Sequence, residues 1–173
     1  MLINLSDILS TNDKTKTVQA ALDMNEFQSM LGTFSIQKKQ PVFLSITHRK
    51  DRELLIKGKT ALTIAIPCDR CLKDVLTDFK IEFDKDISLC ESEDEIEKEE
   101  KNYIDGYNLD VDKLLYNEIL IGWPMKILCS EDCKGVCNVC GQNLNEGTCS
   151  CEDTSLDPRM SVIRDVFKNF KEV

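Results

Sequence analysis

The chain has 173 residues, 42% of them apolar, which is enough for one good core with a small appendage but not for two full domains. Its net charge of −9 excludes a general electrostatic attraction to nucleic acid phosphates, so any RNA contact must be local. Residues 1–80 carry 12 Lys and Arg against 9 Asp and Glu, whereas residues 81–173 carry 10 against 22. The mildly basic first half is therefore the only candidate RNA surface.

The N-terminal residues 1–7 have no basic start and no long apolar run, so they do not resemble a secretory signal. The most apolar later stretch, 119–128, contains Pro124 and Lys126 and is far shorter than the ~20 residues that a membrane helix needs. We therefore expect a cytoplasmic protein without membrane contact. Thiols stay reduced in the cytoplasm, so the nine cysteines are better explained by metal binding than by disulfides.

Alternating apolar residues predict strands between Gln40 and Cys90. Apolar side chains alternate in 42–46 and 62–66, an apolar run follows a charged turn at 54–56, and 75–83 places its aromatic and aliphatic residues on one face. These strands predict an antiparallel meander. The next ten residues, 91–100, carry seven acids and one lysine, so a solvated loop at about 91–101 is expected; mimicry of nucleic acid charge is the alternative.

Two helices are predicted after the acidic run. Asp110 is a plausible N-cap for a helix that reaches about Ile121, where Gly122 and Pro124 end it. A last helix begins at Asp157, and its apolar stripe consists of Ile163, Val166, Phe167 and Phe170. The expected fold class is α+β: an antiparallel sheet with a helix in residues 1–128, followed in 129–173 by a zinc-binding loop and the C-terminal helix.

Six cysteines fall within 23 residues near the C-terminus: Cys129, Cys133, Cys137, Cys140, Cys149 and Cys151. Zinc binds four thiolates at about 2.3 Å in a tetrahedron, and a two-residue gap lets both sulfurs reach one ion. Cys137 and Cys140 fit that spacing best. The second pair is either Cys129 with Cys133, one turn apart on a helix, or Cys149 with Cys151 on one side of a strand. We expect four of the six to hold a structural Zn²⁺.

A catalytic metal is disfavoured because it would keep an open position, usually beside His or carboxylate ligands. The single histidine, His48, lies far away in sequence. No Ser, His and Asp constellation, phosphate-binding glycine loop or acid pair indicates catalysis either. We therefore expect no enzyme, no catalytic residue and no small-molecule substrate.

Cys68 and Cys71 form a further pair at a turn between two predicted strands. Three interpretations of this pair are open: a redox dithiol, half of a second zinc site, or a tight turn packed by two small side chains. In the second case eight thiols fill two zinc sites and Cys90 stays free. Arg70, between the two cysteines, faces either a phosphate, an acidic partner or solvent.

Several motifs resemble the YceD family, whose members are described as factors for large-subunit ribosomal RNA accumulation. The motifs are Cys68-Asp69-Arg70-Cys71-Leu72 after an alternating strand, the helix 109–121 leading into Trp123-Pro124, the cysteine-rich stretches 131–141, 143–145 and 149–151, and Asp157-Pro158-Arg159. The resemblance runs from roughly Gln40 to the C-terminus. It implies a role in making, processing or protecting that RNA, without a known catalytic centre, and with zinc as a scaffold.

The leading hypothesis is a non-enzymatic assembly factor that contacts ribosomal RNA or a precursor particle through the strand region. The candidate contact residues are Arg70, Lys38, Lys39, Arg49, Lys50, Arg52, Lys57 and Lys59. The rival hypothesis is a zinc-stabilised adaptor whose acidic half recruits a ribosomal protein or a processing nuclease and never touches RNA. A redox protein that uses Cys68 and Cys71 is the third.

Overall fold

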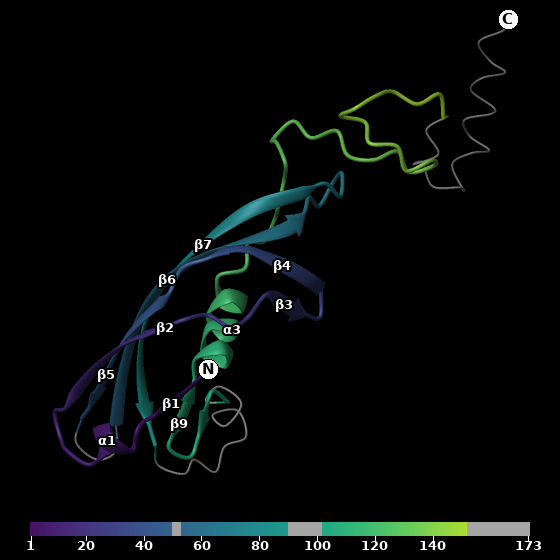
Figure 1. Cartoon of the computed structure of the whole chain (residues 1–173). Coiled ribbons are helices and arrows are strands. Elements are labelled where there is room, and N and C mark those ends of the chain that lie inside the picture. Colours follow the sequence, from purple (N-terminus) through teal and green to yellow (C-terminus); the bar gives the residue numbers. More distant parts are fainter. Residues whose placement is uncertain (50–52, 90–101, 152–173) are drawn as a thin grey trace, which may run out of the picture. The chain divides into compact units, whose positions relative to one another are not determined.

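The computed structural model describes residues 1–49, 53–89 and 102–151 (Figure 1). The acidic loop expected at 91–101, the helix expected from Asp157, and Cys90 lie outside these ranges. The chain forms two compact units. Unit 1 comprises Met1–Ile66 and Leu76–Met125, and unit 2 comprises Pro67–Val75 and Lys126–Val173. Unit 2 thus combines two segments, whereas the expected division after residue 128 leaves 67–75 with the sheet.

The described elements are mostly antiparallel strands with two helices. In chain order they are β1 (Leu2–Asn4), α1 (Ser6–Leu9), β2 (Thr15–Ala20), β3 (Glu26–Ser29), β4 (Gly32–Lys39), β5 (Val42–His48), β6 (Glu53–Pro67), β7 (Asp74–Ser88), β8 (Ile104–Asp105), β9 (Asn108–Asp110) and α3 (Val111–Ile121). The α+β expectation fits this architecture loosely, because strands dominate it.

The main sheet has six strands in the order β2-β5-β6-β4-β3, and β7 also pairs with β6. Two strands pair with successive stretches of β6: β5 with 54–59 and β4 with 62–64. The expected antiparallel run through β5, β6 and β7 is confirmed. One detail differs, since the apolar groups at 54–56 and 62–66 belong to a single strand of 15 residues.

The continuity of β6 depends on small residues at the middle of its buried face. Leu54, Ile56, Leu62 and Ile64 are all buried, and the positions between them on this face are Gly58 and a threonine. A Cβ atom at Gly58 would lie 2.2 Å from the Phe83 ring of β7. Glycine therefore leaves room for a cross-strand aromatic ring, and the break in the apolar pattern marks close packing rather than a turn.

A second, three-stranded sheet has the order β1-β9-β8. Leu2, Ile3 and Asn4 pair antiparallel with residues 108–110, so the start of the chain is fixed beside the start of α3. These strands contain two or three residues each. Such short segments carry too little alternation to be recognised in the sequence.

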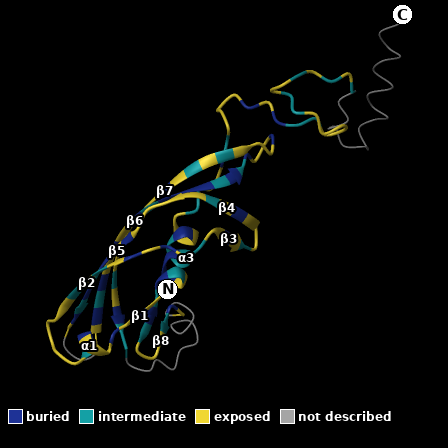
Figure 2. Ribbon diagram, in the orientation of Figure 1, coloured by how far each residue is buried: buried dark blue, intermediate teal, exposed yellow. Residues whose placement is uncertain are grey.

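Helix α3 begins as predicted, because the Asp110 side chain accepts hydrogen bonds from the backbone N–H groups of Asp112 and Lys113. Gly122 forms the C-cap. The helix lies on the inner side of the curved sheet (Figure 1). Its buried residues, Val111, Leu114, Leu115 and Ile119, belong to the core coloured dark blue in Figure 2.

The single tryptophan connects the end of α3 with the sheet. Trp123 stacks on Phe27 of β3 at 5.2 Å between ring centroids, and Phe34 and Phe79 contact it at 5.2 and 5.7 Å. Phe27 also contacts Tyr116 of α3 at 5.0 Å. This aromatic group lies entirely in unit 1.

Among the described residues, no helix combines the length and apolar character needed to cross a membrane.

Candidate metal centres

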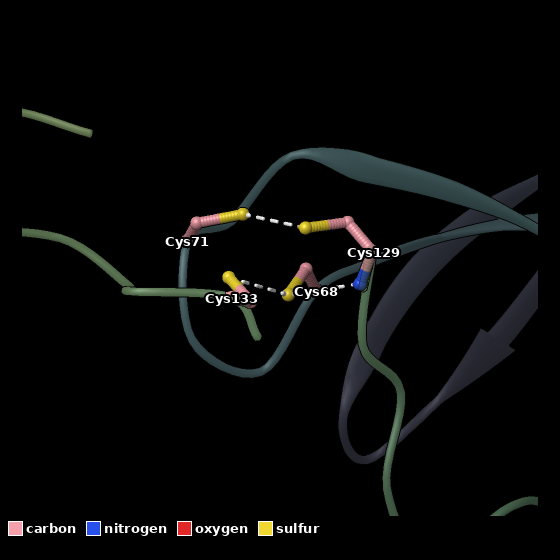
Figure 3. A group of neighbouring side chains, drawn as sticks. All are labelled: Cys68, Cys71, Cys129 and Cys133. Atoms are coloured by element: carbon pink, nitrogen blue, oxygen red, sulfur yellow. Dashed lines mark hydrogen bonds between the residues drawn. The ribbon is translucent and has the colours of Figure 1, made fainter. Parts of the chain in front are cut away.

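Four cysteine side chains from the two segments of unit 2 converge on one point, which we call site 1 (Figure 3). Cys68 and Cys71 come from the turn between β6 and β7, and Cys129 and Cys133 come from the segment after α3. The four sulfur atoms lie within 4.8 Å of one another. Site 1 therefore has a complete set of four thiol ligands.

The sulfur separations in site 1 fit a tetrahedral metal ion. Sγ of Cys68 is 3.9 Å from Sγ of Cys133, and Sγ of Cys71 is 3.5 Å from Sγ of Cys129. Four sulfurs at about 2.3 Å from one zinc ion would be about 3.8 Å apart. A disulfide needs about 2.05 Å, so these pairs are not disulfide-bonded. The geometry indicates a centre that can hold a metal ion.

Site 1 is mostly shielded from solvent. Cys68, Cys71 and Cys133 are buried in a small cluster with Val75, Leu128 and Val136, while Cys129 is exposed. Two N–H groups also point at the sulfurs. The backbone of Cys129 donates to Sγ of Cys68 at 3.4 Å, and the Asn145 amide donates to Sγ of Cys133 at 3.3 Å. Such donors stabilise thiolates and orient metal ligands.

The two residues between Cys68 and Cys71 form hydrogen bonds that connect the two segments of unit 2. Asp69 accepts a hydrogen bond from the backbone N–H of Ile127 at 2.6 Å. The Arg70 guanidinium donates to the carbonyl oxygen of Cys133 at 2.8 Å. Arg70 therefore forms a hydrogen bond within unit 2 in this structure, whereas the sequence left a phosphate, an acidic partner and solvent as its alternatives.

The remaining four described cysteines form site 2, which consists of Cys137, Cys140, Cys149 and Cys151. Their sulfur atoms also lie within 4.8 Å of one another. Cys140 is exposed and the other three are half-buried, so site 2 is more open than site 1. A bridge between Val136 and Asn143 positions the loop that joins the two ligand pairs.

The first ligand pair of each site is held by the same backbone turn. In site 1, Cys68 N–H donates to the Lys73 carbonyl and Leu72 N–H donates to the Cys68 carbonyl, both at 2.9 Å. In site 2, Cys137 N–H donates to the Gln142 carbonyl and Gly141 N–H donates to the Cys137 carbonyl, again at 2.9 Å. We call these turns knuckle 1 (68–73) and knuckle 2 (137–142).

The thiols of each site have divergent pKa values. Burial raises the pKa of Cys68, but backbone N–H donors lower it to about 6. Cys71 accepts from Lys73, yet burial and neighbouring thiols raise its pKa to about 12. In site 2, backbone donors lower the pKa of Cys137 to about 6, and a neighbouring thiol raises that of Cys151 to about 12. Four thiolates this close repel one another unless a cation lies between them.

The structure resolves how the cysteines are grouped, which the sequence left open. It joins Cys149 and Cys151 to the pair at 137 and 140, and it joins Cys129 and Cys133 to the pair at 68 and 71. A turn, rather than a helix, connects Cys129 and Cys133, and residues 147–151 form no strand. The grouping matches the alternative in which eight thiols fill two sites.

The cations expected to contact RNA differ in their partners in the structure. Three of them face acids of β7: Arg49 with Asp86 at 3.0 Å, Lys57 with Asp84 at 2.5 Å, and Lys59 with Glu82 at 3.9 Å. Lys39 binds the carbonyl of Met24 and the side chain of Asn25, and Lys38 is exposed on β4. Lys50 and Arg52 lie outside the described residues.

These pairings reduce the positive potential of the strand surface. The outward positions of β7 include five acids, namely Asp74, Asp78, Glu82, Asp84 and Asp86, with Lys80 as the lysine among them. Exposed ion pairs contribute only about 0–1 kcal/mol each, so the lysines are not locked. The acids of β7 nevertheless neutralise the charge of these cations, and the sequence of each strand alone does not show this pairing.

Comparison with known proteins gives a family for this chain. No curated protein and no solved structure matches it. Residues 56–167 match the family described as "Large ribosomal RNA subunit accumulation protein YceD". The matched range includes β7, α3, both knuckles and all eight cysteines of sites 1 and 2. The chain therefore belongs to the YceD family, as its motifs had suggested.

Proposed function

We propose that this protein is a non-catalytic factor in the accumulation of large-subunit ribosomal RNA, and that two structural Zn²⁺ ions hold its unit 2 together. The family match supports the role in ribosomal RNA accumulation. Within unit 2, two groups of four thiols support the metal centres, because the thiols of each group lie close enough together to surround one ion. A site closed by four protein ligands leaves no position for water or substrate, which is typical of structural zinc.

Zinc fits the donor set better than the other common cations. Four thiolates in a tetrahedron select zinc or iron, whereas calcium and magnesium require oxygen ligands. Reduced thiols also require a reducing compartment, so we place the protein in the cytoplasm. Elemental analysis of the purified protein is expected to find two zinc ions per chain and no iron. One ion per chain, or iron, would contradict this assignment.

Serine substitutions distinguish the two centres. Cys71→Ser together with Cys129→Ser should remove the zinc ion of site 1 and leave one ion per chain. Cys140→Ser together with Cys151→Ser should remove the ion of site 2 instead. Each pair of substitutions is the matched control for the other pair, because the two pairs belong to different sites. If either pair of substitutions removed both ions, unit 2 would contain one joint centre.

The first candidate mode of action is direct contact with ribosomal RNA or a precursor particle. Lys38 is the best-placed cation because it is exposed and forms no ion pair with the residues that the structure describes. Charge reversal of Lys38 and Lys39 should weaken binding and reduce its salt dependence. Reversal of Lys57 and Lys59, which face acids, should have a smaller effect.

The acidic stripe of β7 favours a second candidate, an adaptor that binds a basic ribosomal protein or a processing nuclease. Five outward carboxylates follow one strand, and three of them form ion pairs with Arg49, Lys57 and Lys59. The other two, Asp74 and Asp78, disfavour phosphates and complement a basic protein. Association that survives nuclease treatment would support the adaptor, whereas its loss would support RNA contact.

A sucrose-gradient profile from depleted cells tests the proposed role directly. Depletion should reduce large subunits selectively, and in undepleted cells the protein should sediment with their precursors. An unchanged profile with the protein only at the top of the gradient would contradict the proposal. Disulfide reductase activity that depends on Cys68 and Cys71 would favour the redox hypothesis instead.

A further inference from the structure

The two knuckles differ at one structurally demanding position. Leu72 and Gly141 follow the second cysteine of each knuckle and make the same 2.9 Å hydrogen bond. Both have left-handed backbone conformations, with φ of 60° at Leu72 and 73° at Gly141. Glycine adopts this region without strain, whereas a leucine does so rarely. Knuckle 1 therefore keeps a leucine where the backbone favours glycine.

The Leu72 side chain makes little contribution to packing in the structure. It is 68% exposed, although its neighbours Cys68 and Cys71 are buried. At Gly141 an added Cβ would meet no atom within 4 Å, so the turn itself, and not a lack of space, accounts for glycine there. Neither backbone preference nor burial explains the leucine. A residue held in a strained backbone conformation that neither burial nor space explains is a candidate for a functional role such as binding.

The charge of unit 2 indicates the chemistry of the partner. Its described residues contain five carboxylates against four Lys and Arg. On the proposed assignment, a zinc ion with four thiolates would add a net charge of about −2 at each site. With both ions bound, the unit would be clearly acidic, which disfavours RNA phosphates and favours basic proteins. An aliphatic side chain also lacks the aromatic face on which nucleic acid bases stack.

We propose that Leu72 inserts into an apolar pocket with a basic rim on a protein component of the large-subunit precursor. The inference rests on the proposed function and adds the contact residue and the class of partner. The knuckle fixes the backbone on both sides of Leu72 by hydrogen bonds, so the side chain is presented from a rigid turn. Such pre-organisation reduces the entropy lost on binding.

Leu72→Gly separates binding from folding, because it removes the side chain while relieving the left-handed strain. The test is co-sedimentation of the full-length zinc-loaded protein with large-subunit precursor particles from depleted cells. Leu72→Gly should keep two zinc ions and lose at least about tenfold in affinity, the loss typical of a buried apolar anchor. Leu72→Met should bind nearly as wild type. Met30→Ala, which truncates another exposed apolar residue, should also bind as wild type.

A photo-crosslinking amino acid at position 72 identifies the class of partner. A crosslink to a protein of the particle supports the proposal, and a crosslink to RNA overturns it. Wild-type binding by Leu72→Gly, or loss of its zinc, would also overturn it, because Leu72 would then be dispensable or structural. If the wild-type protein itself stays at the top of the gradient, the proposed function fails together with this inference.

Discussion

The two units are stabilised by different means. Unit 1 buries large aliphatic and aromatic side chains on one face of a curved sheet and on α3. The described part of unit 2 has few buried side chains, mainly three cysteines and Ile127, and contains two clusters of sulfur atoms that could each hold a metal ion. One chain thus combines a core based on the hydrophobic effect with a small unit for which we propose stabilisation by metal ligation.

Metal removal should give the largest difference between the units. Structural zinc in small domains provides an apparent ~10–16 kcal/mol, far more than the few buried side chains of unit 2 can replace. Chelation should therefore abolish hydrogen-exchange protection at Val136 and Leu144, whose N–H groups are bonded within unit 2. Trp123 fluorescence should change little, since its ring contacts belong to unit 1. Retained protection after complete metal removal would show that unit 2 folds without metal.

The reverse experiment targets the aromatic core of unit 1. Phe27 is fully buried and contacts both Tyr116 and Trp123, so Phe27→Ala should lower the free energy of unfolding by about 3–5 kcal/mol. Denaturant unfolding followed by Trp123 fluorescence measures this loss. The zinc content of the folded variant should stay at two ions per chain. A variant that loses zinc while folded would show that the units depend on each other.

A smaller effect is expected from overpacking β6. Gly58→Ala would place a Cβ atom 2.2 Å from the Phe83 ring, which must then move. The expected loss of stability is about 1–3 kcal/mol. Phe83→Leu in the same chain should recover part of it, because the smaller side chain vacates the space. An unchanged melting temperature for Gly58→Ala alone would contradict this account of the strand.

The smallest effect should come from the hydrogen bond between the two metal centres. Asn145 lies in the loop between the ligand pairs of site 2, and its amide donates to Sγ of Cys133 in site 1. Asn145→Ala should weaken zinc binding at site 1 by about 1 kcal/mol, roughly fivefold. Competition titration with a chromogenic chelator measures this change. Asn138→Ala, which removes an exposed side-chain amide of knuckle 2, is a nearby control.

The sequence predicted the parts of the molecule that depend on local patterns. Alternation identified β5 and β7, Asp110 identified the start of α3, and cysteine spacing identified the knuckle at Cys137 and Cys140. These features require only neighbouring residues. The short strands β1, β8 and β9 were missed because two or three residues carry no periodic signal.

The features that the sequence could not determine depend on distant residues. The four ligands of site 1 come from segments 58 or more residues apart, and no local spacing indicates which pairs meet. The role of Asn145 was missed for the same reason, although an asparagine between two cysteine pairs is a usable signal. The neutralisation of Lys57 by Asp84 likewise appears only when β6 and β7 pair.

The two-segment construction of unit 2 has a consequence for the unfolded chain. Cys71 and Cys129, 58 residues apart, enclose β7 and α3, so a metal ion at site 1 acts as a crosslink around elements that it does not touch. In the chain-entropy view, closing a loop of this length removes roughly 4 kcal/mol of unfolded-state entropy. A metal bound in unit 2 would therefore raise the melting temperature of unit 1 through the covalent chain alone.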